Sequence, residues 1–341
     1  MTVRLGINGF GRIGRSLARI LVDGDTRGVD VVAVNEPNAD PETLAFLLEH
    51  DSVAGGLGDR VEASGDVLRV GPHKIAVTSS AEPRSIPWAD HGVDVVVEAS
   101  GHFRSRAEAA AHLDAGARKV VVSAPGLDMD LTVCMGVNDG AYVPANHAVV
   151  SNASCTTNCL APMARVLDDR FGVQQGFMTT VHAYTTDQAL LDQPRSGRRG
   201  TADLRRMRAA GVSIVPTSTG ASRAVGDVLP RLAGRLDGIA LRVPVPNGSI
   251  VDFVATLDRD VTTDEVNQAF QDAVHDKSYR GVIEYTEKPL VSHDILGNAA
   301  SCVFSARDTM ASGRVVKVLG WYDNEFGYAN RLVDLAELMA V

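Results

Sequence analysis

The sequence predicts an α/β protein of two domains: a doubly wound parallel sheet, followed by an α+β domain with a mixed or antiparallel sheet. The chain has 341 residues, more than one domain usually holds, and 45% of them are hydrophobic. Up to about residue 150, short β-branched runs alternate with helical stretches, the pattern of a parallel sheet with crossover helices. From about residue 170 the runs are longer and fewer helices separate them, which favours mixed or antiparallel pairing.

The first domain opens as strand, glycine turn and helix. Residues 3–7 form a short, mainly apolar run, and residues 16–22 place apolar side chains at helical spacing. A second helix is expected at residues 106–115. Further strands of this domain are predicted at residues 31–34, 93–97, 119–123 and 148–151.

The second domain is predicted from four longer runs, at residues 176–182, 239–243, 250–257 and 314–321. Apolar residues return to helical spacing at residues 328–340, and this helix is expected to pack back on the first domain. We therefore expect domains at residues 1–153 and 154–322, with residues 323–341 as a C-terminal helical segment.

Composition favours small-molecule partners. The formal net charge of -9 disfavours nucleic acid and anionic membranes as partners. No apolar run approaches the ~18 residues of a spanning helix, and a strand-like pattern by residue 3 leaves no room for a signal peptide, so a cytoplasmic protein is expected. The four cysteines are too few and too irregularly spaced for a disulfide framework or a CxxC metal site, so we expect reduced thiols and no metal.

Three glycines and one carboxylate predict a dinucleotide site. Gly9, Gly11 and Gly14 stand between the first strand and the first helix, where they allow a tight turn, approach of a pyrophosphate and close helix–strand packing. Glu36 follows Gly14 by 22 residues, at the end of the second strand, where it can accept hydrogen bonds from ribose hydroxyls and repel a 2′-phosphate. NAD is therefore preferred over NADP. The alternative is a packed turn and an exposed loop charge.

Cys155 is the candidate nucleophile. Small polar residues around it precede a helical pattern, so it should lie in the first turn of a helix, where the helix dipole and free N–H groups lower a thiol pKa. The alternative for any cysteine is a buried small hydrophobe, which is the interpretation for Cys134 and Cys302, and Cys159 is also expected to pack. His182 closes a predicted strand and is the candidate base.

Five segments resemble the signatures of the phosphorylating glyceraldehyde-3-phosphate dehydrogenases. They are INGFGRIGR, SNASCTTNCLAP, TTVHAYTTDQ, PTSTGAS and WYDNEFGYANR. The resemblance runs from residue 2 to the C-terminus in the expected order. It implies a Rossmann domain, a catalytic domain with an S-shaped loop at about residues 183–210, and a homotetramer in which that loop approaches a neighbour's cofactor.

The resemblance also implies roles for individual residues. Cys155 matches the nucleophile and His182 the general base. The residues it places at the cofactor, besides the glycines and Glu36, are Arg12, Ile13, Ser100, Ser123 and Asn324. Those it places at the substrate's phosphate are Thr185, Asp187, Arg208 and Arg242, and those at the attacking inorganic phosphate are Ser154, Thr156, Thr219 and Gly220.

The implied reaction oxidises D-glyceraldehyde 3-phosphate to 1,3-bisphosphoglycerate with NAD and inorganic phosphate. A thiolate of Cys155 adds to the aldehyde, His182 takes the hydroxyl proton as hydride leaves, and phosphate cleaves the resulting thioester. The backbone N–H of Cys155 and the His182 side chain can stabilise the oxyanion. Arginines suit both phosphate sites because a planar guanidinium binds phosphate through two hydrogen bonds.

The sequence departs from the family pattern at several positions. Glu36 replaces the usual Asp, which makes erythrose-4-phosphate dehydrogenase the nearest alternative, although residues 182–188 and 322–326 look more like the triose enzyme. Arg223 replaces a usual lysine and Ala54 a common histidine. Together with the arginine-rich stretch at residues 195–202, they raise the alternative of a specialised isozyme that tolerates an inhibitor of the thiol.

The S-shaped loop carries an arginine-rich stretch at residues 195–202, about six residues longer than in the common bacterial form. It is interpreted as a solvated hairpin or a subunit-interface excursion. A sharper hypothesis is that its arginines approach a neighbour's adenosine ribose and permit NADP. A non-enzymatic alternative is a dinucleotide-binding regulator or an RNA binder, but no aromatic residues interleave with the arginines for base stacking.

Overall fold

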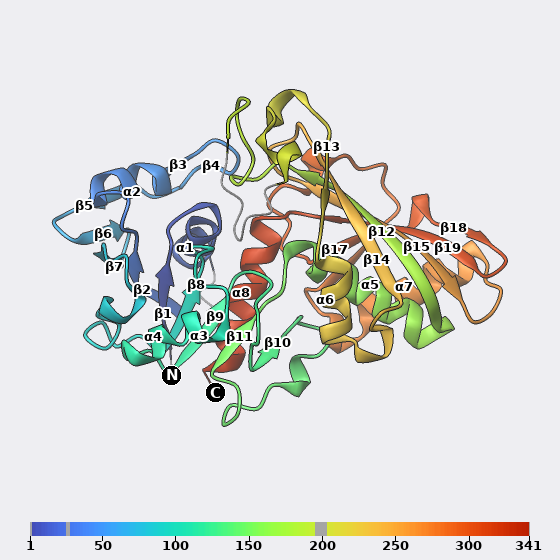
Figure 1. Cartoon of the computed structure of the whole chain (residues 1–341), viewed down its shortest axis with the longest axis horizontal. Coiled ribbons are helices and arrows are strands. Elements are labelled where there is room, and N and C mark those ends of the chain that lie inside the picture. The colour runs from blue at the N-terminus through green and yellow to red at the C-terminus, as the bar shows by residue number, and fades with distance from the viewer. Residues whose placement is uncertain (1, 25–27, 195–202, 341) are drawn as a thin grey trace. The chain divides into compact units, whose positions relative to one another are not determined.

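The chain folds into two compact units. The computed structural model describes residues 2–24, 28–194 and 203–340. One unit is Met1–Ser154 together with Tyr328–Val341, and the other is Cys155–Gly327 (Figure 1). Among the described residues, no helix is long and apolar enough to cross a membrane.

The first unit is built on a mostly parallel sheet. Its strands lie in the order β10-β11-β9-β8-β1-β2-β7-β6-β5, with parallel pairing from β10 to β7 and antiparallel pairing at the β7-β6-β5 edge. The buried central strands are the predicted apolar runs, whereas the antiparallel edge was not predicted. The strands are β1 (Val3–Asn8), β2 (Val29–Asn35), β5 (Val61–Ala63), β6 (Val67–Val70), β7 (His73–Thr78), β8 (Val95–Glu98), β9 (Lys119–Val122), β10 (Leu131–Thr132) and β11 (Val149–Ser151), with a separate hairpin of β3 (His50–Asp51) and β4 (Gly55–Gly56).

Strand β1 lies between β2 and β8, so the strand order reverses beside it: β2 lies on one side of β1 and the later strand β8 on the other. Such a switch point is where open parallel sheets bind ligands, at the carboxyl ends of the strands. The helices of this unit are α1 (Arg12–Asp23), α2 (Pro41–Glu49), α3 (Arg106–Ala109), α4 (Ala111–Asp114) and α8 (Phe326–Met339), with short 3₁₀ turns η1 (Pro83–Ser85) and η2 (Asp139–Ala141). The single helix predicted at residues 106–115 is thus two short helices.

The second unit contains a mixed sheet in the order β13-β14-β12-β15-β19-β17-β16, with β18 paired to β19. Strand β12 is parallel to β14 and antiparallel to β15, which confirms the predicted mixed sheet and the α/β class. The strands are β12 (Val173–Ala183), β13 (Val215–Ser218), β14 (Leu236–Val243), β15 (Ser249–Leu257), β16 (Ile283–Thr286), β17 (Cys302–Ser305), β18 (Met310–Ser312) and β19 (Val315–Tyr322).

Helix α5 (Cys155–Phe171) packs on the central strands of this sheet, and α6 (Ala221–Val228) and α7 (Thr263–His275) contact α5. Strand β15 buries alternate residues, including Val251, Phe253 and Leu257, because successive side chains of a strand point to opposite faces. Short 3₁₀ turns complete the unit: η4 (Leu204–Met207), η5 (Ala210–Val212), η6 (Pro230–Leu232), η7 (Lys277–Tyr279), η8 (Ser292–Ile295) and η9 (Ala306–Asp308).

Candidate active site

The turn before Cys155 is held in an uncommon conformation. Ala153 has a φ of 54°, a left-handed value that costs energy for a residue with a Cβ. Its N–H donates to Ser151 Oγ (2.9 Å) and its carbonyl accepts from Tyr328 Oη (3.0 Å). Both bonds hold the turn that directly precedes Cys155, the first residue of α5.

Cys155 lies beside His182. The distance from Cys155 Sγ to His182 Nε2 is 3.4 Å. Cys155 is half-buried, and His182, near the end of β12, is buried. A thiol and an imidazole nitrogen at this distance are in reach for proton transfer. The structure therefore brings together the predicted nucleophile and the predicted base, which stand 27 residues apart in the sequence.

Only one of the cysteines has the surroundings of a reactive thiol. Cys134, Cys159 and Cys302 are fully buried, which confirms the packing interpretation for them, and burial raises the pKa of Cys134 to about 12. Burial also raises the pKa of the Cys155 thiol, and outweighs the lowering by the Arg242 guanidinium and by hydrogen bonds from Thr156. The prediction of a lowered pKa is therefore wrong, because it counted the helix terminus and not the burial. The thiol accordingly needs a base to take its proton.

Tyr322 fixes the ring of His182 and the start of α5. Its ring meets the His182 ring edge-on, with centroids 5.9 Å apart. Its hydroxyl bonds both Thr156 Oγ1 (2.9 Å) and Thr180 Oγ1 (2.8 Å). The hydroxyl of Thr156 is thus already hydrogen-bonded to Tyr322, and its role in binding inorganic phosphate stays a prediction. Sequence reasoning missed Tyr322, because its partners lie more than a hundred residues away.

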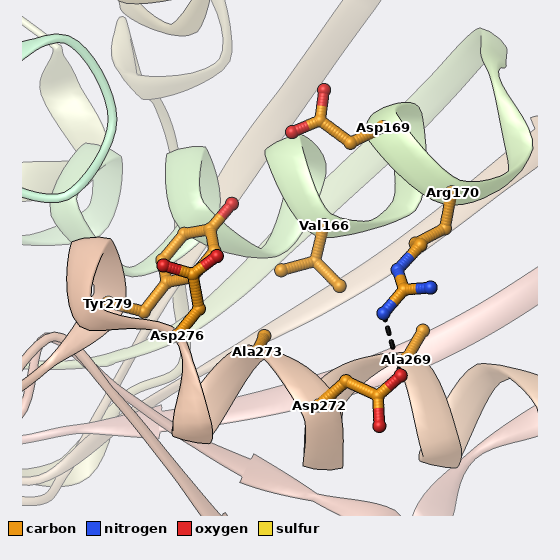
Figure 2. A pocket seen from close by; sticks show the side chains of 8 residues that line it. All are labelled: Val166, Asp169, Arg170, Ala269, Asp272, Ala273, Asp276 and Tyr279. Atoms are coloured by element: carbon orange, nitrogen blue, oxygen red, sulfur yellow. Dashed lines mark hydrogen bonds and ion pairs between the residues drawn. The ribbon is translucent and has the colours of Figure 1, made fainter.

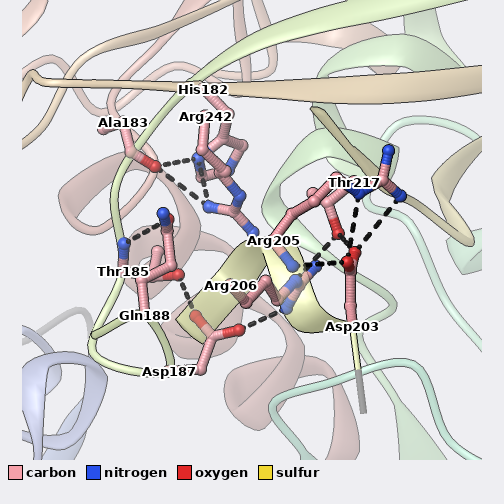
Figure 3. Close-up of polar contacts among 10 residues, drawn as sticks. All are labelled: His182, Ala183, Thr185, Asp187, Gln188, Asp203, Arg205, Arg206, Thr217 and Arg242. Atoms are coloured by element: carbon pink, nitrogen blue, oxygen red, sulfur yellow. Dashed lines mark hydrogen bonds and ion pairs between the residues drawn. The ribbon is translucent and has the colours of Figure 1, made fainter. Parts of the chain in front are cut away.

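Arg242 reaches the other nitrogen of His182. The two residues are register partners on the parallel strands β12 and β14. Arg242 Nη1 lies 2.7 Å from His182 Nδ1 and 3.0 Å from Ala183 O, and His182 Nδ1 lies 2.7 Å from Ala183 O (Figure 3). Burial, followed by the positive charge of Arg242, lowers the pKa of His182 to about 3. Burial and this charge therefore favour the neutral form of the imidazole, in which one of the two ring nitrogens carries no proton.

A second arginine lies in the same cluster. Arg206 forms an ion pair with Asp187 and donates through Nε to Thr217 Oγ1 (2.8 Å), and Asp187 accepts from the Thr185 hydroxyl (Figure 3). Burial raises the pKa of Asp187, but the bond from Thr185 and the charge of Arg206 outweigh it and leave that pKa lowered. Two guanidinium groups against one carboxylate make this a positively charged site suited to an anion.

The predicted phosphate residue Arg208 forms an ion pair with Asp192. Its Nε donates to Asp192 Oδ2 (2.8 Å), and two-thirds of its side chain is exposed. Arg206, two residues earlier on η4, is the arginine beside Asp187 and was missed. Three arginines crowd residues 205–208, and no signal in the sequence shows which of them points at Thr217. The role of Arg208 stays a prediction.

The predicted inorganic-phosphate residues Thr219 and Gly220 directly precede α6. Thr219 Oγ1 accepts from Ala221 N (3.2 Å), and Gly220 is the N-cap residue. A helix N-terminus offers unpaired N–H groups to an anion. Ser154, assigned to the same anion, belongs to the other compact unit, so its approach to Thr219 stays a prediction.

The glycine turn of the first unit fits a dinucleotide. Gly9 has a φ of 93°, and a Cβ there would lie 2.4 Å from Ser100 N. A Cβ at Gly14 would lie 2.2 Å from Gly9 O, so both positions need glycine for packing. Around Gly11, by contrast, nothing lies within 4 Å of such a Cβ. This surface at the start of α1 is therefore clear for the close approach of a pyrophosphate.

Glu36 lies against this turn. Its Oε2 accepts from Phe10 N (3.1 Å) and its Oε1 from Asn38 N (3.1 Å), which fixes the carboxylate just beyond the end of β2. The carboxylate keeps acceptor capacity for hydroxyl groups.

The remaining predicted cofactor residues lie on several elements. Arg12 and Ile13 begin α1, and Ser123 N donates to Glu98 O. Asn324 is buried in the second unit, where its side-chain oxygen accepts from Ser249 Oγ.

A buried carboxylate behind the turn was not foreseen. Glu98 accepts through one oxygen from Asn8 Nδ2 and His112 Nε2, and through the other from the N–H and hydroxyl of Ser100. Trp88 Nε1 donates to His112 Nδ1 (3.0 Å), and because an indole N–H only donates, the proton of His112 is on Nε2. Four donors thus hold the Glu98 carboxylate and tie β1 to the Ser100 turn.

The substitution Glu98→Gln is expected to destabilise the protein by about 1–3 kcal/mol, because the new amide N–H₂ faces groups that also donate. We also expect weaker NAD binding, because the Ser100 turn backs Gly9. Urea unfolding and a binding titration measure both. The matched control is Glu62→Gln, on the surface, with an expected effect within about 0.5 kcal/mol. Equal unfolding midpoints for the two variants would contradict this role of Glu98.

A separate hollow of about 290 Å³ lies between α5 and α7. Its lining includes Asp169, Asp272, Asp276 and Tyr279, and Arg170 reaches across to Asp272 (2.6 Å, Figure 2). The lining contains no cysteine or histidine, and no group of three or more potential metal ligands occurs in the part of the chain that the structure describes. We therefore assign the chemistry to Cys155 and its neighbours.

Comparison with known proteins agrees with this geometry. Residues 3–106 match the family model described as glyceraldehyde 3-phosphate dehydrogenase, NAD binding domain, and residues 154–324 match the C-terminal domain of the same family. The chain belongs to the glyceraldehyde-3-phosphate dehydrogenase family. It is 53% identical over 336 residues to glyceraldehyde-3-phosphate dehydrogenase of Streptomyces coelicolor, covering 98% of each chain, and 51% identical over 341 residues to glyceraldehyde-3-phosphate dehydrogenase 1 of Bacillus subtilis, covering 100% of this chain and 99% of the relative.

Membership of the glyceraldehyde-3-phosphate dehydrogenase family confirms the resemblance seen in the motifs. Because the first match is to the family's NAD-binding domain, the protein is an NAD-dependent oxidoreductase. This agrees with the cofactor that was predicted from the position of Glu36. The alternatives of an erythrose-4-phosphate enzyme and of a non-enzymatic regulator are less well supported than the main prediction. The hypothesis of NADP use rests on residues 195–202, which lie outside the described residues.

Proposed function

We propose that this protein performs the phosphorylating oxidation of D-glyceraldehyde 3-phosphate through a thioester on Cys155, with His182 as the base. The observation that carries the proposal is the 3.4 Å contact between Cys155 Sγ and His182 Nε2, next to the two arginines Arg206 and Arg242. A nucleophile, a neutral base and an anion site around one thiol suit a small phosphorylated aldehyde.

The first half of the reaction forms the thioester. The sulfur of Cys155 forms a bond to the aldehyde carbon as His182 Nε2 takes the thiol proton, which passes to the carbonyl oxygen. His182 then removes the hydroxyl proton as the carbon loses a hydride, and a thioester remains on Cys155. NAD, when bound, supplies the hydride acceptor. The backbone N–H of Cys155, at the free end of α5, is available to the developing oxyanion.

The second half releases the product. An oxygen of inorganic phosphate attacks the thioester carbon, the carbon–sulfur bond breaks, and the pair of electrons returns to Cys155 sulfur. His182 gives back a proton to that sulfur, and an acyl phosphate leaves. The start of α6 at Thr219 and Gly220 is the place we propose for the attacking phosphate.

An assay of NADH formation from glyceraldehyde 3-phosphate tests this proposal, with and without inorganic phosphate. Sustained turnover that requires phosphate is the expected result, with erythrose 4-phosphate as the poorer substrate. Sustained turnover at the same rate in phosphate-free buffer would show that water, not phosphate, cleaves the intermediate, and the phosphorylating reaction would be excluded.

We further propose a homotetramer in the cytoplasm. Phe177 on β12 is 71% exposed and Ile239 on β14 is 49% exposed, and the register places them on one face of the sheet. Exposed apolar groups that gather in this way mark interaction surfaces. Further exposed apolar side chains lie in residues 190–214: Leu190, Leu191, Leu204, Val212 and Ile214. The four free cysteines suit a reducing compartment.

The substitution Phe177→Lys is expected to lower the oligomeric state, because it buries a charge in the proposed interface. Sedimentation velocity should show a smaller species than the wild-type protein at equal concentration. The control is Leu127→Lys, which places the same charge at another exposed apolar residue in the first unit. An unchanged sedimentation coefficient for Phe177→Lys would place the interface elsewhere.

A further inference from the structure

The carboxylate of Glu98 is a buried negative charge that no cation contacts in the described part of the chain. The groups that bond it belong to Asn8, Ser100 and His112. His112 is neutral, because its Nδ1 accepts from the indole N–H of Trp88 and therefore carries no proton. No lysine or arginine is among these partners. The charge of Glu98 is thus stabilised by hydrogen bonds and not by an ion pair.

The orientation of each partner directs a donor at this carboxylate. Asn35 Nδ2 donates to Asn8 Oδ1 (2.8 Å), which leaves the N–H₂ of Asn8 for Glu98. Ser100 Oγ accepts from His102 N (3.1 Å), which leaves its own hydrogen for Glu98. All the partners therefore donate. Such a network suits an anion, because a protonated carboxyl group would have to donate in its turn.

An ion at this depth is costly, and it lies next to the cofactor turn. Glu98 is 1% exposed, and burying a charge is unfavourable unless hydrogen bonds offset the loss of water. Residues that go against the rules of packing in this way are expected at functional sites. Ser100, which Glu98 holds, backs Gly9 of the glycine turn. The charge therefore lies immediately behind the surface that suits a dinucleotide.

The strand order places Glu98 on the nicotinamide side of the cofactor site. Glu36, beyond the end of β2, suits the adenosine ribose, and the surface at Gly11 is clear for the pyrophosphate. Strand β8 lies on the opposite side of β1 from β2, and Glu98 is its last residue. A dinucleotide that extends from Glu36 past Gly11 therefore brings its nicotinamide half toward the end of β8. The family resemblance predicts Ser100 at the cofactor as well.

We propose that the charge of Glu98 makes the site selective for the oxidised cofactor, NAD⁺ over NADH. The two forms carry the same pyrophosphate and differ by one positive charge, on the nicotinamide ring of NAD⁺. At an effective dielectric constant of about 20, unit charges about 12 Å apart change an affinity about tenfold, so the ring need not touch the carboxylate. This selectivity favours the replacement of NADH by NAD⁺ after hydride transfer. It does not depend on the thioester chemistry.

Calorimetric titrations with NAD⁺ and with NADH, on protein without substrate, test the proposal. Glu98→Gln removes the charge and keeps the shape, and it should lower the ratio of the two affinities about tenfold, chiefly by weakening NAD⁺ binding. Glu98→Asp keeps the charge on a shorter side chain, so it should weaken both cofactors and keep the ratio within about twofold. An unchanged ratio in Glu98→Gln, or the same fall in both variants, would overturn the proposal.

The control is Glu62→Gln, which removes a charge from the surface of the same unit and should leave the ratio unchanged. A measurement on the wild-type protein applies even if Glu98→Gln does not fold. Salt screens surface charges, including those behind the net charge of -9, but screens a buried charge much less. The wild-type protein should therefore prefer NAD⁺ to a similar extent at about 0.05 M and about 0.5 M salt. Equal affinities for the two forms, or a preference that disappears at high salt, would show that Glu98 does not provide the selectivity.

Discussion

In a Cys155→Ser variant, NADH formation from glyceraldehyde 3-phosphate is expected to fall by at least about 10⁴-fold, the scale seen when an enzyme loses its covalent nucleophile. A serine hydroxyl remains protonated far above the pH at which a thiol ionises, and it adds poorly to an aldehyde. NAD affinity should stay unchanged, because the glycine turn and Glu36 lie on other elements. Initial rates and a fluorescence titration with NAD measure the two quantities.

The matched control is Cys159→Ser, one helical turn further along α5. Cys159 Sγ lies 3.5 Å from Gly320 O in a fully buried position, and a serine there can keep that bond. Its activity should stay within a few-fold of wild type. If Cys155→Ser kept full activity, or if Cys159→Ser lost it while remaining folded, the nucleophile would be misassigned.

In a His182→Asn variant, kcat is expected to fall by about 10²–10⁴-fold, which is the rate enhancement that a positioned general base usually contributes. The reason is specific to this site: burial raises the thiol pKa of Cys155, and His182 Nε2, 3.4 Å from its sulfur, is the acceptor that we propose for the thiol proton. Alkylation of Cys155 by iodoacetamide should slow as well, and this second readout needs no substrate.

The control for that variant is His293→Asn, an exposed histidine on η8. It should leave both kcat and the alkylation rate unchanged. A His182→Asn protein that is alkylated as fast as wild type would mean that the thiol does not depend on the imidazole for its reactivity.

The sequence predicts the central strands of both sheets because buried strands read as β-branched runs. Strands β8 and β9 are nearly continuous valine, as expected for a parallel sheet covered on both faces. The antiparallel edge β5-β6-β7 was missed, because its strands are short and mix polar with apolar residues. The break between α3 and α4 at Ala110 was also missed; nothing in the local sequence marks it.

The residues of the site likewise fall into those that the sequence predicts and those that it does not. Cys155, His182 and the glycine turn were found because their residue types and positions carry a chemical meaning. Arg206, Tyr322 and the Glu98 network were not found, because they act through partners brought close only by the fold. The direction of the thiol pKa failed for a related reason, since burial depends on tertiary packing that a local pattern does not contain.

The most direct test of the covalent account is intact-mass spectrometry of the protein mixed with glyceraldehyde 3-phosphate and NAD in phosphate-free buffer. The account predicts a burst of about one NADH per subunit, an acyl adduct on the peptide that contains Cys155, and loss of that adduct on addition of inorganic phosphate. A burst without an adduct, or an adduct on another residue, would contradict it.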